Sequence, residues 1–397
     1  MTRPTLFAAP HRPLFAFGIL QALLVMLLWA HELAARLGFW TSLAWPLPPT
    51  WWHGLLMIHG VFVFLIFGFI MTAGPRWQGA PEVRPGIYLP TALVMACGWV
   101  LTYIGLAVRA LFMSGLAVLL VGWLVGLVGL VQLCRHPNPD RGHVLVVTGA
   151  VGLGALSLAG MLAFAAGASS SFATASLTLG IWGFLLPVFF TVCHRMLPFF
   201  SSSSIPNYRV IRPRWTLWFV LASSLGHAGF VLAGLEQMLW LVDLPAALVT
   251  AWLVAVWGFW ASFVNRMLSV LHVAFAWLPL ALLLSALSSL MFWLGQGSLG
   301  LAPLHALTLG CFTSLVVGMG SRVTLGHSGR PIVADRVMWG CFWAIQLAAL
   351  VRIGAELLAG AGALSLLAAL IWLGAFVIWA WHYGPALWKP REDGLPG

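Results

Sequence analysis

Apolar residues dominate this chain in long runs, and short polar segments separate one run from the next. Most runs reach about twenty residues, the length that an α-helix needs to cross a hydrocarbon core roughly 30 Å thick. Barrel strands would alternate apolar and polar residues, and these runs do not. We therefore predict an all-α polytopic membrane protein. The twelve predicted spans are residues 14–38, 52–74, 88–108, 112–134, 143–167, 172–194, 215–235, 239–262, 268–294, 301–321, 335–358 and 364–386.

The composition agrees with this pattern and leaves no room for a soluble domain. Hydrophobic residues make up 61% of the 397 positions and charged residues 7%, and the mean hydropathy is +0.99. A soluble domain carries about 25% charged residues. We predict that residues 1–397 form a single transmembrane domain. Chemistry must then be carried by residues inside or beside the bilayer.

The loop charges predict the orientation of the chain. With the N-terminus inside, 16 of the 19 Lys and Arg residues fall on inner segments, and only Arg36, Arg109 and Arg352 fall outside. The positive-inside rule therefore places both termini in the cytoplasm. The net charge of +10 contains no basic run, so we expect no nucleic-acid partner. The five cysteines are dispersed and form no CxxC or CxxCH motif, which argues against iron–sulfur clusters and covalently bound haem.

Three spans end in related phrases. The second, sixth and tenth leave the inner face through MTAGPRW, TVCHRMLP and VGMGSRVT, so Arg76, Arg195 and Arg322 recur at intervals of four helices. This spacing suggests three four-helix units. His59 and His305 each lie 17 residues before the arginine of their span, and the middle unit has a threonine there. At 1.5 Å per residue, both histidines would lie in the outer half of the membrane.

A histidine at membrane depth is a functional candidate, because burying its ring without a partner is costly. Two imidazoles at one depth, His59 and His305, could bind a haem from both faces, and neutral imidazole also binds copper. The alternative for each is a structural hydrogen bond to a carbonyl or a hydroxyl group. His53 is either a ligand or part of an interfacial aromatic belt. His227, in mid-span, is a candidate ligand for a metal or a second haem, whereas His31 resembles part of a helix-end ion pair with its neighbours.

A second layer of candidates lies towards the inside. His194, His272 and His327 could form a metal or second haem site there. Arg322 and Arg330 flank His327 and could hold an anionic group such as a haem propionate. The alternative for these arginines is simple positive-inside anchoring.

Several motifs stand out along the chain: WWHGLLMIHG and GFIMTAGPRWQG in the second span, LHVAFAWLPLALLL in the ninth, and HALTLGCFTSLVVGMGSRVTLGHSGRP in the tenth. In these motifs the chain resembles the NnrS family of polytopic membrane proteins. The resemblance implies twelve helices, bound haem and copper, and a link to denitrification and nitric oxide tolerance. By motif, it carries a family role to His53, His272, His305, Arg322 and His327.

The chain departs from the family pattern in one place. The family commonly opens its second span with His-x-His-Glu, but here His53 is followed by Gly54, Leu55 and Leu56, with His59 further along. Either histidine could therefore be the ligand. The helix count and the histidines of spans two and ten also resemble haem-copper oxidase subunits, by analogy of fold alone. The paired adjacent histidines that bind copper in those oxidases are missing.

These observations lead to one main functional hypothesis and two rivals. We expect a b-type haem protein of the bacterial inner membrane, with copper as a second cofactor, that binds or redox-processes NO. Its partners would be the lipid bilayer, NO, and a quinol or protein electron donor. The first rival is an NO reductase or quinol-linked oxidoreductase. The second is a transporter or metal-handling protein without haem, although few carboxylates lie within the spans.

Overall fold

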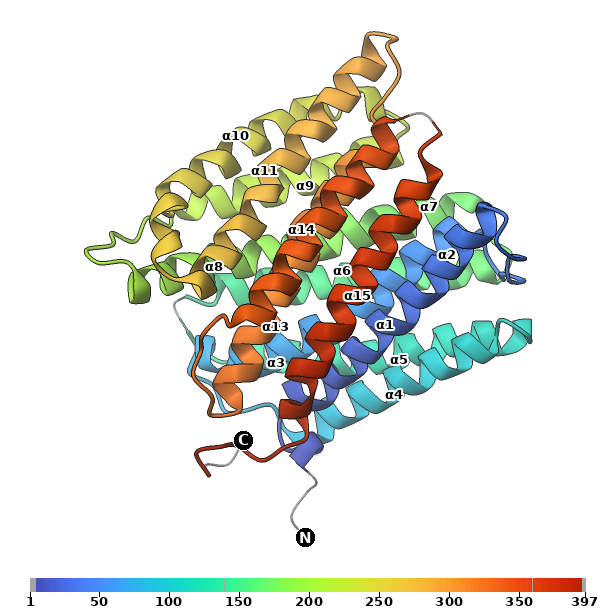
Figure 1. Ribbon diagram of the computed structural model, residues 1–397. Coiled ribbons are helices and arrows are strands. Elements are labelled where there is room, and N and C mark those ends of the chain that lie inside the picture. The colour runs from blue at the N-terminus through green and yellow to red at the C-terminus, as the bar shows by residue number, and fades with distance from the viewer. Residues whose placement is uncertain (1–4, 139, 359, 395–397) are drawn as a thin grey trace.

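The computed structural model describes residues 5–138, 140–358 and 360–394, and this part of the chain consists of helices joined by loops (Figure 1). Twelve of the described helices are long and apolar enough to cross a membrane, so the predicted all-α polytopic class is confirmed. A helix suits the bilayer because it satisfies its own backbone hydrogen bonds. The spans are α1 (His11–Arg36), α2–η2–α3 (Pro49–Leu56, Met57–Phe62, Val63–Gln78), α4 (Pro85–Ile104), α5 (Arg109–Cys134), α6 (Gly142–Ala165), α7–η3–α8 (Ser170–Thr178, Leu179–Leu185, Leu186–Ser204), α9 (Arg214–Leu232), α10 (Trp240–Val256), α11 (Arg266–Trp293), α12–η6–α13 (Ala302–His305, Ala306–Thr313, Ser314–His327), α14 (Arg336–Leu357) and α15 (Gly362–Tyr383).

Local sequence signals mark where several helices begin and end. Pro49 and Pro85 lie in the first turn of α2 and α4, where the N–H that proline lacks would have no helical partner. Asn265 and Asp335 cap α11 and α14 by accepting backbone N–H groups through their side chains. Gly79 ends α3 with a φ of 62°, a conformation that glycine adopts without strain.

Three composite helices form the centre of the molecule: Pro49–Gln78, Ser170–Ser204 and Ala302–His327, called here the central helices. Buried residues make up 83%, 72% and 72% of their most apolar stretches, against at most 67% in any other described span. They are the second, sixth and tenth spans. The burial pattern therefore supports the three four-helix units that the sequence repeat suggests.

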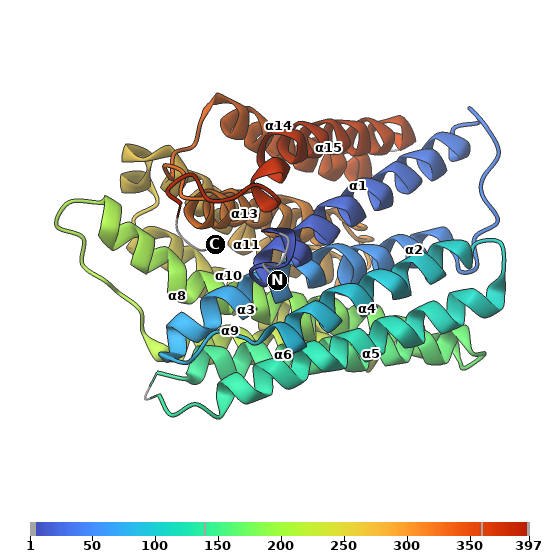
Figure 2. The same cartoon turned by 90° about the horizontal axis from the view of Figure 1, so that it is seen from below.

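The three units contact one another around the bundle. α5 packs against α6, α10 against α11, and α15 against α1, so the last span lies beside the first (Figures 1 and 2). The buried side chain of Arg12 joins these ends, because its Nη1 donates to the carbonyls of Leu387 and Lys389 at 3.0 Å each. The first and last described segments therefore lie at one end of the molecule. This end is called inner and the opposite end outer, after the predicted orientation.

Each central helix contains a π-helical segment. These are η2 (Met57–Phe62), η3 (Leu179–Leu185) and η6 (Ala306–Thr313), and each interrupts the outer half of its helix. π-Helical turns are rare, and they occur frequently at functional sites. The outer part of the central bundle is therefore a candidate region for a functional site.

Two helix ends differ from the sequence prediction. α8 continues to Ser204, ten residues past the predicted end at His194, because tertiary contacts to Arg195 and Ser201 hold the polar extension. α10 ends at Val256 rather than at residue 262, because Gly258 takes a φ of 87° and turns the chain. α13 and α3 also run past their predicted ends, to His327 and Gln78. The other ends lie within a few residues of the prediction.

Candidate metal centre and buried histidine networks

The outer ends of two central helices bring His53 and His305 within electrostatic range of each other. A carbonyl oxygen only accepts hydrogen bonds, so Nδ1–H of His305 donates to the Leu301 carbonyl at 2.9 Å. Its Nε2 therefore carries a free lone pair. The His53 ring stacks on Trp29 with centroids 4.3 Å apart, and its Nδ1 is buried with no hydrogen-bond partner in the described chain. A ring fixed by a backbone carbonyl, with its other nitrogen free, is typical of metal-binding histidines.

Two arginines lie beside this histidine pair. Arg36 and Arg352 both interact electrostatically with His53, and Arg352 also interacts with His305. Arg36 forms an ion pair with Glu32 at 2.8 Å, part of the helix-end pair that the sequence predicts. Nη1 of Arg352 is buried without a hydrogen-bond partner among the described residues. The outer site therefore combines two imidazoles with a guanidinium group that binds Glu356 through Nη2 and has a free Nη1.

His59 makes contacts of a different kind. Its fully buried ring lies 2.8 Å through Nε2 from Oγ of Ser157, which in turn donates to the Ser176 carbonyl at 2.6 Å. The hydroxyl proton is thus already used, so Nε2–H of His59 is the donor in its bond to Ser157. An electrostatic interaction joins His305 to His53, and Nδ1 of His59 is also buried without a hydrogen-bond partner among the described residues. Ligation of haem or metal by any of the three stays a prediction.

His227 lies in a buried hydrogen-bond network between α9, α10 and α11. Its Nδ1 is 2.9 Å from each carboxylate oxygen of Asp243, and Ser285 donates to the same carboxylate at 2.6 Å. The ring also stacks on Trp182, with centroids 3.4 Å apart. Carboxylates orient metal-binding histidines in this way, leaving Nε2 to face the ligand. The predicted role of His227 as a ligand is compatible with this geometry and stays a prediction.

The end of α8 receives two of the predicted inner residues. His272 Nε2 is 2.9 Å from Oγ of Ser201, and the guanidinium carbon of Arg322 lies 3.7 Å from the centre of the Phe200 ring. Arg322 thus makes a cation–π contact. His272 and Arg322 therefore reach the same helix end through separate partners.

His194 pairs with a histidine that the sequence argument set aside. Its Nδ1 is 3.1 Å from Nε2 of His143, and its Nε2 lies 3.1 Å from Oγ1 of Thr216 and 3.3 Å from the carbonyl oxygen of Pro213. Both rings are at least nine-tenths buried. Both ring nitrogens of His194 are thus used by protein partners, and the structure does not bring this residue together with His272 or His327 into one site.

Next to this pair, Asp140 holds the inner ends of two helices together. Its carboxylate is 2.9 Å from Nη1 of Arg195 and 3.5 Å from Nη2 of Arg212. Burial alone would raise the pKa of Asp140, but the hydrogen bond and the positive charge of Arg195, together with His143 and Arg212, hold it below its ordinary value.

His327 lies against the first helix. Its ring centroid is 4.6 Å from that of His11, and Arg330 forms an ion pair with Glu392 at 2.7 Å. The carboxylate that Arg330 binds is therefore supplied by the chain itself. The expected binding of a propionate by Arg322 and Arg330 stays a prediction.

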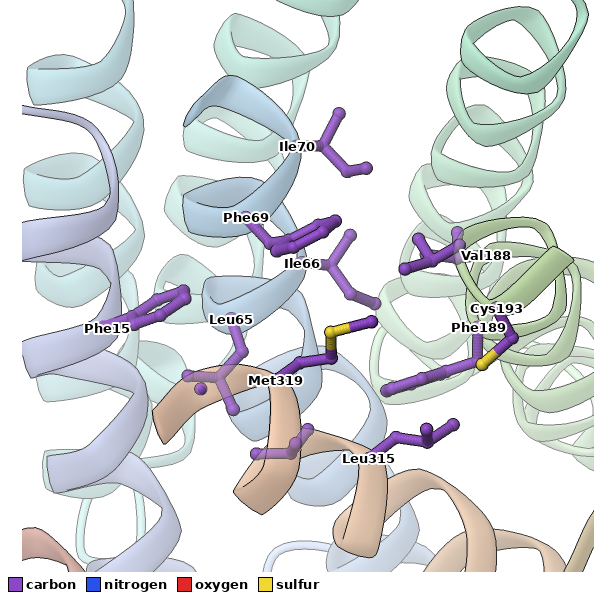
Figure 3. A pocket seen from close by; sticks show the side chains of 13 residues that line it. Phe15, Leu65, Ile66, Phe69, Ile70, Val188, Phe189, Cys193, Leu315 and Met319 are labelled. Atoms are coloured by element: carbon purple, nitrogen blue, oxygen red, sulfur yellow. The ribbon is translucent and has the colours of Figure 1, made fainter. Parts of the chain in front are cut away.

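An apolar cavity of about 60 Å³ lies between α1, α3, α8 and α13 (Figure 3). Side chains from the three central helices converge on it, among them Phe69, Val188 and Met319. The volume is about that of two water molecules, and a space lined by apolar side chains stays dry. A porphyrin is far larger than this space, so the cavity itself suits only a small apolar molecule.

The described residues contain no group of three or more His, Cys, Asp or Glu side chains that could hold a metal ion. The chain matches the family model described as NnrS protein over residues 5–391 of 397. It belongs to the NnrS family. No individual curated protein matches this NnrS-family chain. Its membership supports a role connected with the nitric oxide response, while the cofactors and the mechanism are matters for proposal.

Sequence reasoning missed some residues of this NnrS-family chain that the structure makes prominent. Asp243, in the first turn of α10, is 1% exposed and bonded to His227. The two lie at equal distances from the loop around Gly234 and Leu235, so a hairpin of α9 and α10 brings them face to face. That symmetry was a usable signal. No comparable signal in the sequence indicated the contact between His143 and His194, which lie 51 residues apart.

Proposed function

We propose that this chain is a b-type haem protein of the bacterial inner membrane that binds NO in the nitric oxide response. The single observation that carries the proposal is the pair His53 and His305, at the outer ends of two central helices, with lone pairs not used by the protein. Family membership supports the nitric oxide connection. The positive-inside pattern of the loops supports the orientation.

The donor set favours haem over copper at this pair. The porphyrin would supply four ligands of a haem iron, so one or both of these imidazoles would be enough to hold it, and NO could bind where only one does. A copper ion would find only these two histidines, because the described residues provide no third His, Cys, Asp or Glu ligand. Copper, if bound, would therefore need a different site, for which His227 with its carboxylate partner is the best-oriented histidine.

The surroundings of the pair fit the propionates of a haem. The buried Nη1 of Arg352 has no partner among the described residues, and a propionate would satisfy it with a charge-assisted hydrogen bond. Haem iron held by imidazole supplies one-electron redox chemistry and an affinity for diatomic ligands. The role of this chain's own residues is to hold both rings and to keep water away from them.

The apolar cavity supports a diatomic ligand that arrives through the membrane. NO is small and apolar, so it dissolves in lipid and needs no polar pathway. The cavity lies among the central helices and is lined by apolar side chains, with sulfur contributed by Cys193 and Met319 (Figure 3). We propose that it holds NO on its way between the bilayer and the haem.

The deciding experiment is the visible spectrum and haem content of protein purified in detergent, with single alanine variants. We expect His53→Ala and His305→Ala each to lose most of the Soret absorbance or to shift it. His59→Ala should keep the spectrum, because its fully buried ring is fixed by the bond to Ser157 and shows no electrostatic interaction with His53 or His305. His382→Ala, an exposed histidine at the opposite end of the bundle, is the control and should match the wild type.

Two results would overturn the assignment in different ways. A colourless wild-type protein with no haem would remove the haem proposal and favour the transporter or metal-handling alternative. A coloured protein in which His59→Ala, but not His53→Ala, abolishes the spectrum would keep haem and restore the pair suggested by the sequence repeat.

An NO reductase or quinol-linked oxidoreductase is the second candidate. A reductase must deliver protons into the membrane, and the buried Asp243 now supplies a carboxylate that sequence reasoning had not found there. Steady NO consumption by purified protein, with an added electron donor, would establish turnover. NO binding without consumption would leave the binding role.

A further inference from the structure

The pair His143 and His194 at the inner end of the bundle has a hydrogen-bond pattern that fixes where each proton lies. The hydroxyl proton of Thr216 goes to the Pro213 carbonyl at 2.7 Å. Oγ1 of Thr216 and this carbonyl can thus only accept from Nε2 of His194, which must carry a hydrogen.

The rest of the pattern follows from this starting point. In its neutral form, His194 has a lone pair on Nδ1, so it accepts from Nε2–H of His143 across 3.1 Å. Neutral His143 then has its own lone pair on Nδ1. That atom is buried and has no hydrogen-bond partner among the described residues. The pair therefore ends in one open proton acceptor.

The open acceptor faces the inner surface. The nearest carboxylate oxygen, Oδ1 of Asp140, lies 3.9 Å from Nδ1 of His143, and the Asp140 side chain is 37% exposed. Two arginines, Arg195 and Arg212, face the same carboxylate. A small rotation of Asp140 would bring it within hydrogen-bond distance of His143 while it remains in contact with water.

We propose that His143 and His194 form a proton-uptake site, which takes one proton from the inner aqueous phase by way of Asp140. The proton adds to Nδ1 of His143, which is oriented to receive it. His143 can then pass its Nε2 proton to Nδ1 of His194, so that the single positive charge is shared between the two rings. No bond other than N–H is made or broken, and no cofactor takes part.

Protonation of the pair must overcome first the cost of placing a charge in a buried site, and then the effect of the charged groups around it. Asp140 from the loop before α6 favours the positive charge. Arg195 of α8 and Arg212 from the loop before α9 oppose it. Because Asp140 binds both arginines, it offsets their charge at the point where the proton enters. Removing the carboxylate should therefore make uptake harder and leave the ring-to-ring contact in place.

Nitrogen NMR of protein labelled with ¹⁵N-histidine in lipid nanodiscs tests this directly, with His143→Gln used to assign the signals. At neutral pH we expect Nδ1 of His143 to give the signal of an unprotonated nitrogen. On acidification, the signals of His143 and His194 should shift together with one midpoint. Asp140→Asn should lower that midpoint by about one pH unit, since an opposite charge a few ångströms away shifts a pKa by about 1–3 units when buried.

Glu82→Gln, an exposed carboxyl change on the inner loop before α4, is the matched control and should leave the midpoint unchanged. Three results would each overturn the proposal: a proton on Nδ1 of His143 at neutral pH, separate midpoints for the two rings, or the same midpoint in Asp140→Asn and wild type. If His143→Gln fails to fold, the comparison of wild type with Asp140→Asn still decides, because only one pair of signals should move. None of these results depends on whether the protein binds haem.

Discussion

His227 and Asp243 form a two-point contact inside the membrane domain, in which Nδ1 of the imidazole is 2.9 Å from both carboxylate oxygens. The contact joins α9 to α10, and Ser285 adds α11 to the same network. Both partners are buried, so water cannot replace a lost partner. This network is the one place in the described spans where a buried carboxylate and a buried histidine are directly bonded.

We expect Asp243→Ala to lower the free energy of unfolding by about 3 kcal/mol, because it leaves the His227 ring and the Ser285 hydroxyl buried without their acceptor. Thermal unfolding of the purified protein in detergent would measure the change. Asp243→Asn keeps an acceptor in place and should cost less. Glu236→Ala, an exposed position before α10, should behave like wild type, and an unchanged midpoint for Asp243→Ala would contradict the role of the network.

Glycines allow α4 and α5 to pack closely. A Cβ on Gly98 would lie 2.6 Å from the backbone nitrogen of Leu119, and backbone atoms cannot move aside as a flexible side chain can. We expect Gly98→Val to cost about 1–3 kcal/mol of stability by forcing the helices apart. Gly149→Val on α6 is the control, since a Cβ there meets nothing within 4 Å. Equal folded yields for both variants, by fluorescence-detected size exclusion, would be evidence against the close contact.

The ion pairs of Asp140 lead us to expect that the protein loses stability in acid. Its folded-state pKa is lowered, so the carboxylate stabilises the protein above the unfolded carboxyl pKa of about 4, and this contribution disappears as the pH falls through the folded value. Because the side chain is 37% exposed, solvent screening limits the contribution to about 1 kcal/mol or less. Asp140→Asn should be slightly less stable than wild type at pH 7, and the difference should vanish once the pH falls below the folded pKa of Asp140. A difference that grows on acidification would contradict this sign.

The apolar cavity predicts binding of xenon, which enters dry apolar spaces in proteins. Xenon NMR or diffraction from pressurised crystals should locate a site lined by Val188, Val192 and Met319. Val192→Phe should fill the space and abolish the site. Val128→Phe, at a half-exposed position on α5, adds the same ring elsewhere and should not. Xenon retained in Val192→Phe would show that the cavity is not the site.

Much of the architecture could be predicted from the sequence, because the bilayer imposes its own length on every helix. The spans and the class follow from apolar runs, and the three units follow from the repeat around Arg76, Arg195 and Arg322. Helix ends that rely on tertiary partners could not be predicted. The polar end of α8 is one example, since Ser201 needs His272, which lies 71 residues away.

The candidate site could be predicted only in part. Depth along a helix is a simple count, and it selected His59 as the partner of His305. The side of the helix that a ring faces also depends on the number of residues in each helical turn, and the π-helical segment η2 begins between His53 and His59. The motif resemblance pointed to His53, and the structure gives that residue an electrostatic interaction with His305. Networks such as His143 with His194 depend on which helices become neighbours, which the sequence alone does not state.

The π-helical segments have a consequence for how the central helices present their side chains. One residue turns an α-helix by about 100°, and a π-helical turn holds an additional residue. The outer and inner halves of each central helix are therefore rotated relative to each other about the helix axis. A change in the length of the π-helical segment would alter this rotation. Deleting a single residue from η2 would turn His53 away from His305 and leave the cavity-lining face of α3 where it is.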